Sequence, residues 1–216
     1  MLYVRKTFRR FGILTQKERM LAELPYKAWL DGLTQEREKC QRACFELNGI
    51  CPTEREKRKM KIKEIFGKTG NDIHVESPFY CDYGYNIEVG ESFYSNYNCV
   101  ILDTAKVTIG DSVMFGPNVS LYTAGHPLHP ESRNSGYEYG ISIKIGNNVW
   151  IGGNTVVTGG VTVGNNCVIG AGSVVTKDIP DNSLAVGNPC RVIRQITEDD
   201  RDFYFKGRKF DVTDYR

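Results

Sequence analysis

The chain has 216 residues, of which 40% are hydrophobic and 25% are charged, and its formal net charge is +2 at pH 7. This length can bury a real core, and the balanced charge gives no general reason to expect binding to nucleic acid or a membrane. No segment approaches the ~20 apolar residues of a membrane helix. Residues 1–16, a basic extension to which the pattern assigns no structure, lack the apolar stretch of a signal peptide. We therefore expect a cytoplasmic protein.

Residues 17–70 are predicted to form a helical segment. The first helix is predicted over 34–48, with Thr34 as its N-cap. The second begins at Thr53, where Glu56 completes a capping box. Two short amphipathic helices cannot bury their apolar faces alone, so they are expected to pack on the rest of the chain or on a neighbouring subunit. The apolar face of the second helix consists of Met60, Ile62, Ile65 and Phe66.

A branched or small residue returns at every sixth position from residue 145 to residue 178. The period of six fits neither an α-helix nor an isolated strand, but it is typical of a chain wound into stacked, three-sided coils. Glycine, asparagine and aspartate dominate the predicted corners, as positive φ demands. The members of the period are Ile145, Ile151, Val157, Val163, Ile169 and Val175.

The coil is predicted over residues 71–189, as roughly five turns. Residues 122–142 break the period with histidine, proline, arginine and tyrosine, and we interpret them as a loop that leaves the coil. A two-residue slip of the period near Asp103 and Thr104 predicts a bulged corner. Residues 190–216 form a polar, aromatic-rich tail. A stack with flat faces and an exposed last coil favours assembly with copies of itself.

The seven cysteines of the chain form no CxxC pair, and their number is odd. Cys99 and Cys167 fall in the repeat, where a small apolar residue suits the interior. The pattern favours reduced, structural thiols over disulfides or a metal cluster.

Six motifs in this order make the chain resemble the hexapeptide-repeat acetyltransferases, specifically the maltose and galactoside O-acetyltransferases. The maltose branch is the more similar of the two. The motifs are CDYGYNI (81–87), TAGHP (123–127), RNSGYEYG (133–140), IGNNVWIGG (145–153), VTKDIPDN (175–182) and GNPCRVIR (187–194).

The resemblance implies a mainly β fold, a left-handed parallel β-helix of hexapeptide repeats with an N-terminal α-helical segment. The hand comes from the resemblance alone, because the general rule for parallel crossovers is right-handed. It also implies a homotrimer with active sites between subunits, acetyl-CoA as the donor and a sugar hydroxyl as the acceptor, with no metal required.

His126 is the predicted catalytic base, because a sugar hydroxyl must lose its proton as it attacks a thioester, and imidazole suits that task near neutral pH. The resemblance also places Asn96 in the catalytic and donor site, whereas a corner amide that satisfies its own backbone is the simpler interpretation. The Gly153 N–H is a candidate donor to the oxyanion. A zinc site built from His126, His129 and His74 fits poorly, because two of these histidines share one irregular loop.

The donor groove implied by the resemblance runs along two coil edges and is lined by small residues. Arg191 and Arg194 are placed to meet phosphates, although a solvated C-terminal surface is the alternative. Trp150 is predicted at a corner, as a wall for donor or acceptor or as a subunit contact. The remaining groove residues are Gly153, Ala171, Thr176 and Lys177.

The acceptor site is predicted from carboxylates and aromatic faces, which commonly hold sugars. Thr104 and Ala28 stand where the galactoside branch has aspartates, which favours a glucose-type acceptor such as maltose. Other acceptors, namely an amino-sugar, a polysaccharide precursor or a xenobiotic, and a non-catalytic scaffold remain alternatives. The predicted acceptor residues are Asp82, Tyr83, Asp103, Thr104 and Glu138, with Tyr139 beside them.

Overall fold

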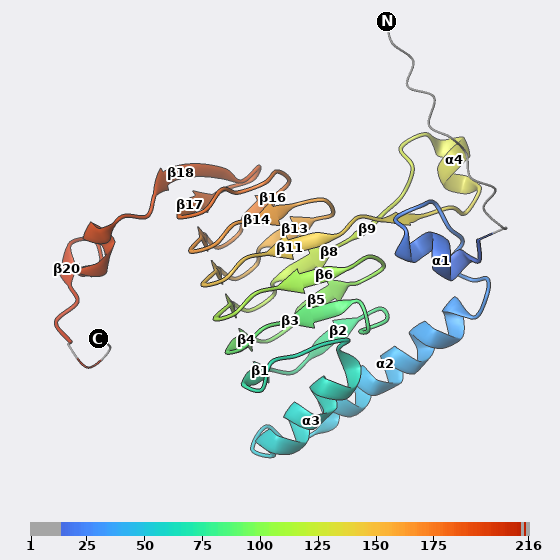
Figure 1. Ribbon diagram of the computed structural model, residues 1–216, viewed down its shortest axis with the longest axis horizontal. Coiled ribbons are helices and arrows are strands. Elements are labelled where there is room, and N and C mark those ends of the chain that lie inside the picture. Colours follow the sequence, from blue (N-terminus) through green and yellow to red (C-terminus); the bar gives the residue numbers. More distant parts are fainter. Residues whose placement is uncertain (1–13, 213, 215–216) are drawn as a thin grey trace, which may run out of the picture.

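The computed structural model describes residues 14–212 and 214, so residues 1–13 of the predicted extension lie outside the described part. The chain winds into a three-sided parallel β-helix, with helices packed against its N-terminal end (Figure 1). The first side contains β1 (Ile73–Val75), β4 (Phe93–Ser95), β7 (Met114–Phe115), β12 (Trp150–Ile151), β15 (Val168–Ile169) and β17 (Ser183–Val186).

The second side contains β2 (Phe79–Cys81), β5 (Cys99–Leu102), β8 (Ser120–Tyr122), β13 (Val156–Thr158) and β16 (Val174–Val175). The third side contains β3 (Ile87–Val89), β6 (Val107–Ile109), β11 (Ile143–Ile145) and β14 (Thr162–Val163). Five strands on the second side and a sixth parallel strand on the first make about six turns, one more than the roughly five predicted.

The sixfold period is confirmed, because its members stack in register through the middle of the coil. On the second side Ile101 pairs with Leu121, Leu121 with Val157, and Val157 with Val175. These four side chains are completely buried. Each strand is only two to four residues long, so the inward position of each rung packs on the rungs above and below it, and this stacking supplies the hydrophobic core.

Asparagine takes the positive φ at three corners of the main repeat, and glycine does so at Gly160 and Gly172. Asn148, Asn154 and Asn166 have φ values of 56°, 58° and 56°. The other corner glycines, such as Gly152, are needed for a different reason, the close approach of the next coil. A Cβ on Gly152 would lie 2.6 Å from the backbone nitrogen of Ala171. The prediction of positive φ was therefore right for asparagine and wrong for these glycines.

Three helices precede the coil: α1 (Gln16–Leu21), α2 (Leu33–Gly49) and α3 (Arg55–Ile65). The predicted caps of the second and third were wrong. Gly32, with a φ of 84°, is the N-cap of α2, so Thr34 lies inside the helix. Glu54 is the N-cap of α3, and the Thr53 hydroxyl instead lies 3.2 Å from the Cys51 sulfur. Neither N-cap residue makes a side-chain hydrogen bond to its helix.

Helices α2 and α3 close the N-terminal end of the coil with apolar side chains. Leu47, Ile62, Ile65 and Phe66 are buried in the same core cluster as the first coil. Met60, which was predicted to belong to this face, is 71% exposed. Residue 60 lies two positions before Ile62, which places its side chain on another face of the helix.

The loop that leaves the coil after β8 is an antiparallel hairpin with a short helix at its tip. Its elements are β9 (Ala124–Gly125), α4 (Pro130–Asn134) and β10 (Tyr139–Gly140). The tail begins with β18 (Arg191–Gln195), which pairs antiparallel with β17. It then leaves the coil (Figure 1) through a 3-10 turn (Glu198–Arg201) and the hairpin of β19 (Phe203–Phe205) and β20 (Arg208–Lys209). No helix within the described residues has the length and apolar character needed to cross a bilayer.

Candidate active site

The residues predicted to form the site lie on two different edges of the three-sided coil. We define the first edge as the corner between the first and second sides, and the second edge as the corner between the second and third sides. The first edge carries the residues that follow β4, β12 and β15, namely Asn96, Gly153 and Ala171. The second edge carries the residues that follow β2, β5 and β8, namely Asp82 with Tyr83, Asp103 with Thr104, and the loop with His126.

Asp103 lies inside the second edge and shapes the turn above it. Its side chain is 0% exposed, and its Oδ1 accepts hydrogen bonds from the backbone N–H groups of Asp82 (3.0 Å) and Tyr83 (2.9 Å). Burial raises the pKa of Asp103 to about 7, although these two N–H groups oppose the rise. The carboxyl group thus fixes the backbone from which Asp82 and Tyr83 project.

Thr104 is also buried, 3.1 Å from the Thr123 hydroxyl. The Thr123 hydroxyl in turn donates to the carbonyl of Leu102 at 2.6 Å. Asp103 and Thr104 are therefore held in the corner, while Asp82 and Glu138 are only partly buried. Asp82 and Glu138 are the carboxylates of this group that a ligand can reach in the single protomer.

Burial raises the pKa values of both Asp82 and Tyr83. Burial raises the pKa of Asp82 above its ordinary value, and the positive charge of Arg37 on α2 opposes this rise. Burial also raises the pKa of Tyr83 to about 12. The Tyr83 hydroxyl is buried and has no hydrogen-bond partner among the described residues. An orphaned buried hydroxyl is costly unless a ligand or water completes it.

The N-terminal segment completes the second edge, which the sequence did not predict. Tyr26 is fully buried, and its hydroxyl donates to Glu138 Oε1 at 2.5 Å. The two residues also form a backbone bridge, with N···O distances of 2.9 Å and 3.0 Å. Burial and the hydrogen bond to Glu138 together raise the pKa of Tyr26. No local signal links residues 26 and 138, so only the tertiary structure reveals this pair.

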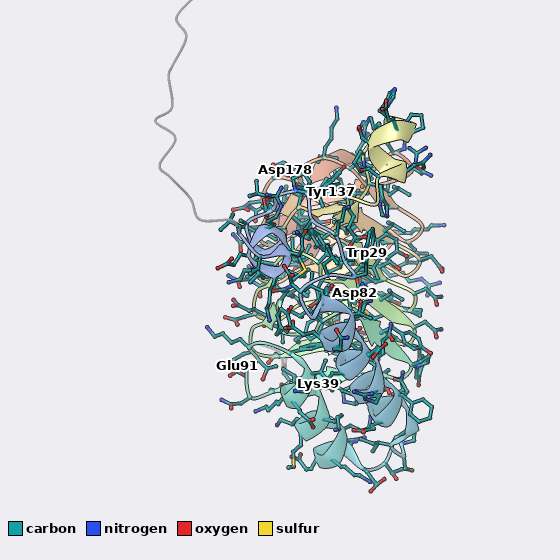
Figure 2. The ribbon with its side chains drawn as sticks, turned by 90° about the vertical axis from the view of Figure 1, so that its right-hand side faces the viewer. Trp29, Lys39, Asp82, Glu91, Tyr137 and Asp178 are labelled. Atoms are coloured by element: carbon teal, nitrogen blue, oxygen red, sulfur yellow. The ribbon has the colours of Figure 1, made fainter. Side chains whose placement is uncertain are left out.

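Two aromatic side chains near this segment were also missed, Trp29 and Tyr137, which are both labelled in Figure 2. Trp29 is 55% exposed, and the Lys27 ammonium lies 5.9 Å from its ring and 5.0 Å from the ring of Tyr137. Gly136 has a φ of 82°, which favours glycine, and a Cβ there would lie 2.1 Å from the Trp29 ring. Exposed rings next to carboxylates are suited to the apolar face of a sugar.

His126 follows β9 at the base of the loop and is exposed. Within the described residues it forms no hydrogen bond or ion pair, so its imidazole is available on the single protomer. His129 is exposed at the N-terminus of α4. His74 is in β1, where its Nε2 lies 3.0 Å from Glu76. The described structure therefore does not bring the three histidines together as a metal site.

At the first edge, the Asn96 side chain accepts a hydrogen bond from the Tyr97 N–H at 2.8 Å. Its amide thus satisfies the adjacent backbone, while its NH₂ group has no partner among the described residues. The Gly153 N–H also donates to no group in the described part of the chain. It faces Gly116, where a Cβ would lie only 2.6 Å from the Gly153 nitrogen. Two donors are thus free along this edge.

The remaining donor-site residues are spread over the upper coils. Trp150 lies within β12, between Met114 and Val168, and is 52% exposed. Its predicted place at a corner was wrong, because the side chain points outward from a strand of the first side. Ala171 is exposed at the first edge, and Thr176 and Lys177 are exposed after β16 at the second edge.

The two arginines of β18 are both exposed. Arg191 donates to the carbonyl of Cys190 at 2.7 Å. Arg194 forms a two-point ion pair with Asp200, with both N···O distances 2.7 Å. Hydrogen bonding to Arg194 lowers the pKa of Asp200 to about 2. A phosphate at Arg194 must therefore compete with the Asp200 carboxylate.

Two family models match the chain. The maltose acetyltransferase hexapeptide capping motif matches residues 19–70, which begin inside α1 and contain α2 and α3. The bacterial transferase hexapeptide model, with six repeats, matches residues 142–177. The N-terminal helices and the later turns of the coil are thus matched by two separate models, in the same order as along the chain.

The relatives agree with these models. The chain is 48% identical over 192 residues to the galactoside O-acetyltransferase of Escherichia coli K12, covering 89% of this chain and 95% of the relative. A solved maltose O-acetyltransferase from Clostridium difficile 630 is 53% identical, with a TM-score of 0.85 over 87% of this chain and all of that one. A galactoside acetyltransferase solved with coenzyme A is 47% identical, with a TM-score of 0.89 over 92% of this chain and all of that one.

Proposed function

The chain belongs to the galactoside and maltose O-acetyltransferase family, whose fold is the left-handed parallel β-helix, and from this premise we propose its specific reaction. The protein transfers the acetyl group of acetyl-CoA to a hydroxyl of a maltose- or glucose-type sugar. His126 acts as the general base. The site forms between two subunits of a homotrimer, and transfer is direct.

The main support for a site between two subunits is that the predicted residues lie on two different edges of the coil. His126 and the acceptor residues belong to the second edge, whereas Asn96 and Gly153 belong to the first. One whole side of the coil separates the two edges of a protomer. A ring of three copies closes when the first edge of each meets the second edge of the next, which is a heterologous contact closed by rotation. Each site then has one edge from each of two neighbours.

The proposed reaction begins with removal of the hydroxyl proton by the His126 imidazole. The sugar oxygen attacks the thioester carbon, a C–O bond forms, and the carbonyl oxygen gains negative charge. The unpartnered N–H of Gly153 is suited to stabilise this oxyanion. Collapse breaks the C–S bond, and the imidazolium gives its proton to the departing thiolate. The base is restored, and the products are the acetylated sugar and CoA.

The acceptor is proposed to lie on the second edge, against Asp82, Tyr83 and Glu138. The partly buried carboxylates of Asp82 and Glu138 offer hydrogen bonds to sugar hydroxyls, and the buried Tyr83 side chain lies beside Asp82. Asp103 and Thr104 support this corner from within. The absence of aspartate at position 104 supports a glucose-type acceptor over a galactoside.

The donor is proposed to follow the first edge of one subunit past Asn96, Gly153 and Ala171, with Trp150 as a wall. Arg191 and Arg194 are proposed to meet its phosphates, and Thr176 and Lys177 to reach it from the second edge of the neighbour. Acetyl-CoA and seven unpaired cysteines both support a cytoplasmic location.

The proposal is tested by incubating the enzyme with acetyl-CoA and maltose, glucose, a galactoside and an amino-sugar, and following the release of CoA thiol. We expect the maltose- or glucose-dependent rate to fall by about 10²–10⁴-fold in His126→Ala, with acetyl-CoA binding retained by calorimetry. His74→Ala, which changes a histidine of the first coil, is the matched control and keeps the wild-type rate.

Equal rates for His126→Ala and the wild type would remove His126 from the mechanism. A higher kcat/KM for the galactoside or the amino-sugar than for maltose and glucose would overturn the acceptor. No thiol release with any sugar would favour a different substrate class or a scaffold.

A further inference from the structure

Three buried cysteines converge where the helical segment meets the first coil. Cys40 and Cys44 lie one turn apart on α2, and Cys81 ends β2. All three are buried, with exposures of 6%, 2% and 6%. The Cys81 sulfur lies 3.4 Å from that of Cys40 and 3.7 Å from that of Cys44, and all three sulfurs lie within 4.8 Å of one another.

These separations are close to those required by a single metal ion. Thiolate sulfurs bound to zinc at about 2.3 Å lie about 3.8 Å apart in tetrahedral geometry. The spacing of four on α2 places two ligands on one helix face, and β2 supplies the third from the opposite side. We propose that Cys40, Cys44 and Cys81 bind one thiophilic cation of the Zn²⁺ or Cd²⁺ type, which joins α2 to the first coil.

A thiol binds a cation as its thiolate, so binding at this cluster is coupled to loss of protons. Each thiol that becomes a ligand then releases its proton to solvent, so the affinity rises with pH.

An adjacent cavity gives the ion an entry path and space for a fourth ligand. It has a volume of about 690 Å³ and is lined by Cys44, Cys81 and Asp82, among other residues of α2 and the second side. Zinc sites with three protein ligands are commonly completed by water. The three sulfur positions follow from the helix–coil contact, so the proposal does not rest on the proposed acceptor, although Asp82 lines the same cavity.

The experiment measures metal uptake by the full-length protein, stripped of metal and reduced. The protein is equilibrated with Zn²⁺, passed through a desalting column and analysed by mass spectrometry of the metal. We expect about one zinc per chain for the wild type and near none for Cys81→Ser or Cys44→Ala. With Cd²⁺ the wild type should gain the ultraviolet charge-transfer band of a metal thiolate. Zn²⁺ should also raise the Tm of the wild type, but not of these variants.

Two matched controls separate the cluster from general thiol binding and from core damage. Cys51→Ser removes an exposed thiol, and Cys99→Ser alters a buried thiol inside the coil. Both should retain the zinc and the Cd²⁺ band. If Cys81→Ser does not fold, Cys44→Ala alone decides, because alanine preserves α2. Uptake by the wild type no greater than by Cys44→Ala, or loss of zinc from Cys51→Ser, would overturn the proposal.

Discussion

The Tyr26 hydroxyl donates a 2.5 Å hydrogen bond to Glu138, which joins the N-terminal segment to the loop that carries His126. Because Tyr26 is 0% exposed, Tyr26→Phe leaves a half-buried carboxylate without its partner, at a cost of about 1–3 kcal/mol. Glu138 is then free to move, so we expect the KM for the sugar to rise roughly tenfold while the KM for acetyl-CoA is unchanged.

Steady-state kinetics with each substrate varied in turn checks this expectation. Tyr204→Phe is the control, because this tyrosine of β19 is 59% exposed in the tail. An equal rise in both KM values would show that Tyr26 supports the whole fold and not the acceptor side.

Gly116 keeps the Gly153 N–H open at the first edge. A Cβ at position 116 would lie 2.6 Å from the Gly153 nitrogen, so Gly116→Ala must displace or cover this donor. We expect kcat to fall about 10²–10³-fold, as for the loss of an oxyanion donor. Gly110→Ala is matched, because its Cβ would meet Asn147 Oδ1 of the next coil at 2.3 Å. Single-turnover rates of the two folded variants give the comparison, and similar losses in both would contradict the role of Gly153.

Mixed trimers test whether each site uses two chains. His126→Ala disables the second edge and Asn96→Ala the first, so each homotrimer should be poorly active. In trimers assembled from equal amounts of both variants, about one quarter of the sites combine two intact edges. We expect about that fraction of wild-type activity to return after denaturation and joint refolding. A site within one protomer would give no recovery, because every chain carries one defect.

The ion pair of Arg194 with Asp200 makes a prediction about pH. Hydrogen bonding to Arg194 lowers the folded-state pKa of Asp200 from 3.8 to about 2. The contribution of the pair to the ordered tail is therefore present above the ordinary pKa of aspartate and is lost as the pH falls through about 2. NMR titration of the Asp200 carboxyl carbon should show a higher pKa in Arg194→Ala than in the wild type, still below the ordinary value because the Thr197 N–H continues to donate to Asp200 at 2.9 Å.

The same pair should restrain donor binding. Asp200→Asn frees Arg194 for a phosphate, so we expect the KM for acetyl-CoA to fall, most clearly at low salt. Asp199→Asn removes a neighbouring exposed carboxylate and should leave the KM unchanged. A rise in KM for Asp200→Asn would mean that the carboxylate positions Arg194 for the donor.

The local pattern of the chain was sufficient to predict the coil. The period through Ile151, Val157 and Val163 specifies inward positions that stack on one another, and each rung contacts only its neighbours. The break at residues 122–142 also showed where the chain leaves the coil. These two inferences succeeded because each depends on residues close together in sequence. The site residues came from motifs whose order along the chain resembles one family, and their roles stay predictions.

Contacts across long sequence separations were decided only by the tertiary structure. Tyr26 reaches Glu138 across 112 positions, and Cys81 meets Cys40 across 41. Neither pair leaves a periodic signal in the sequence, because both contacts arise from the packing of α2 and the N-terminal segment on the coil. The burial of Asp103 and the placement of His126 and Gly153 on different edges likewise depend on how the chain winds. The six-residue period determined the coil, whereas three-dimensional packing determined which side chains lie together at its edges.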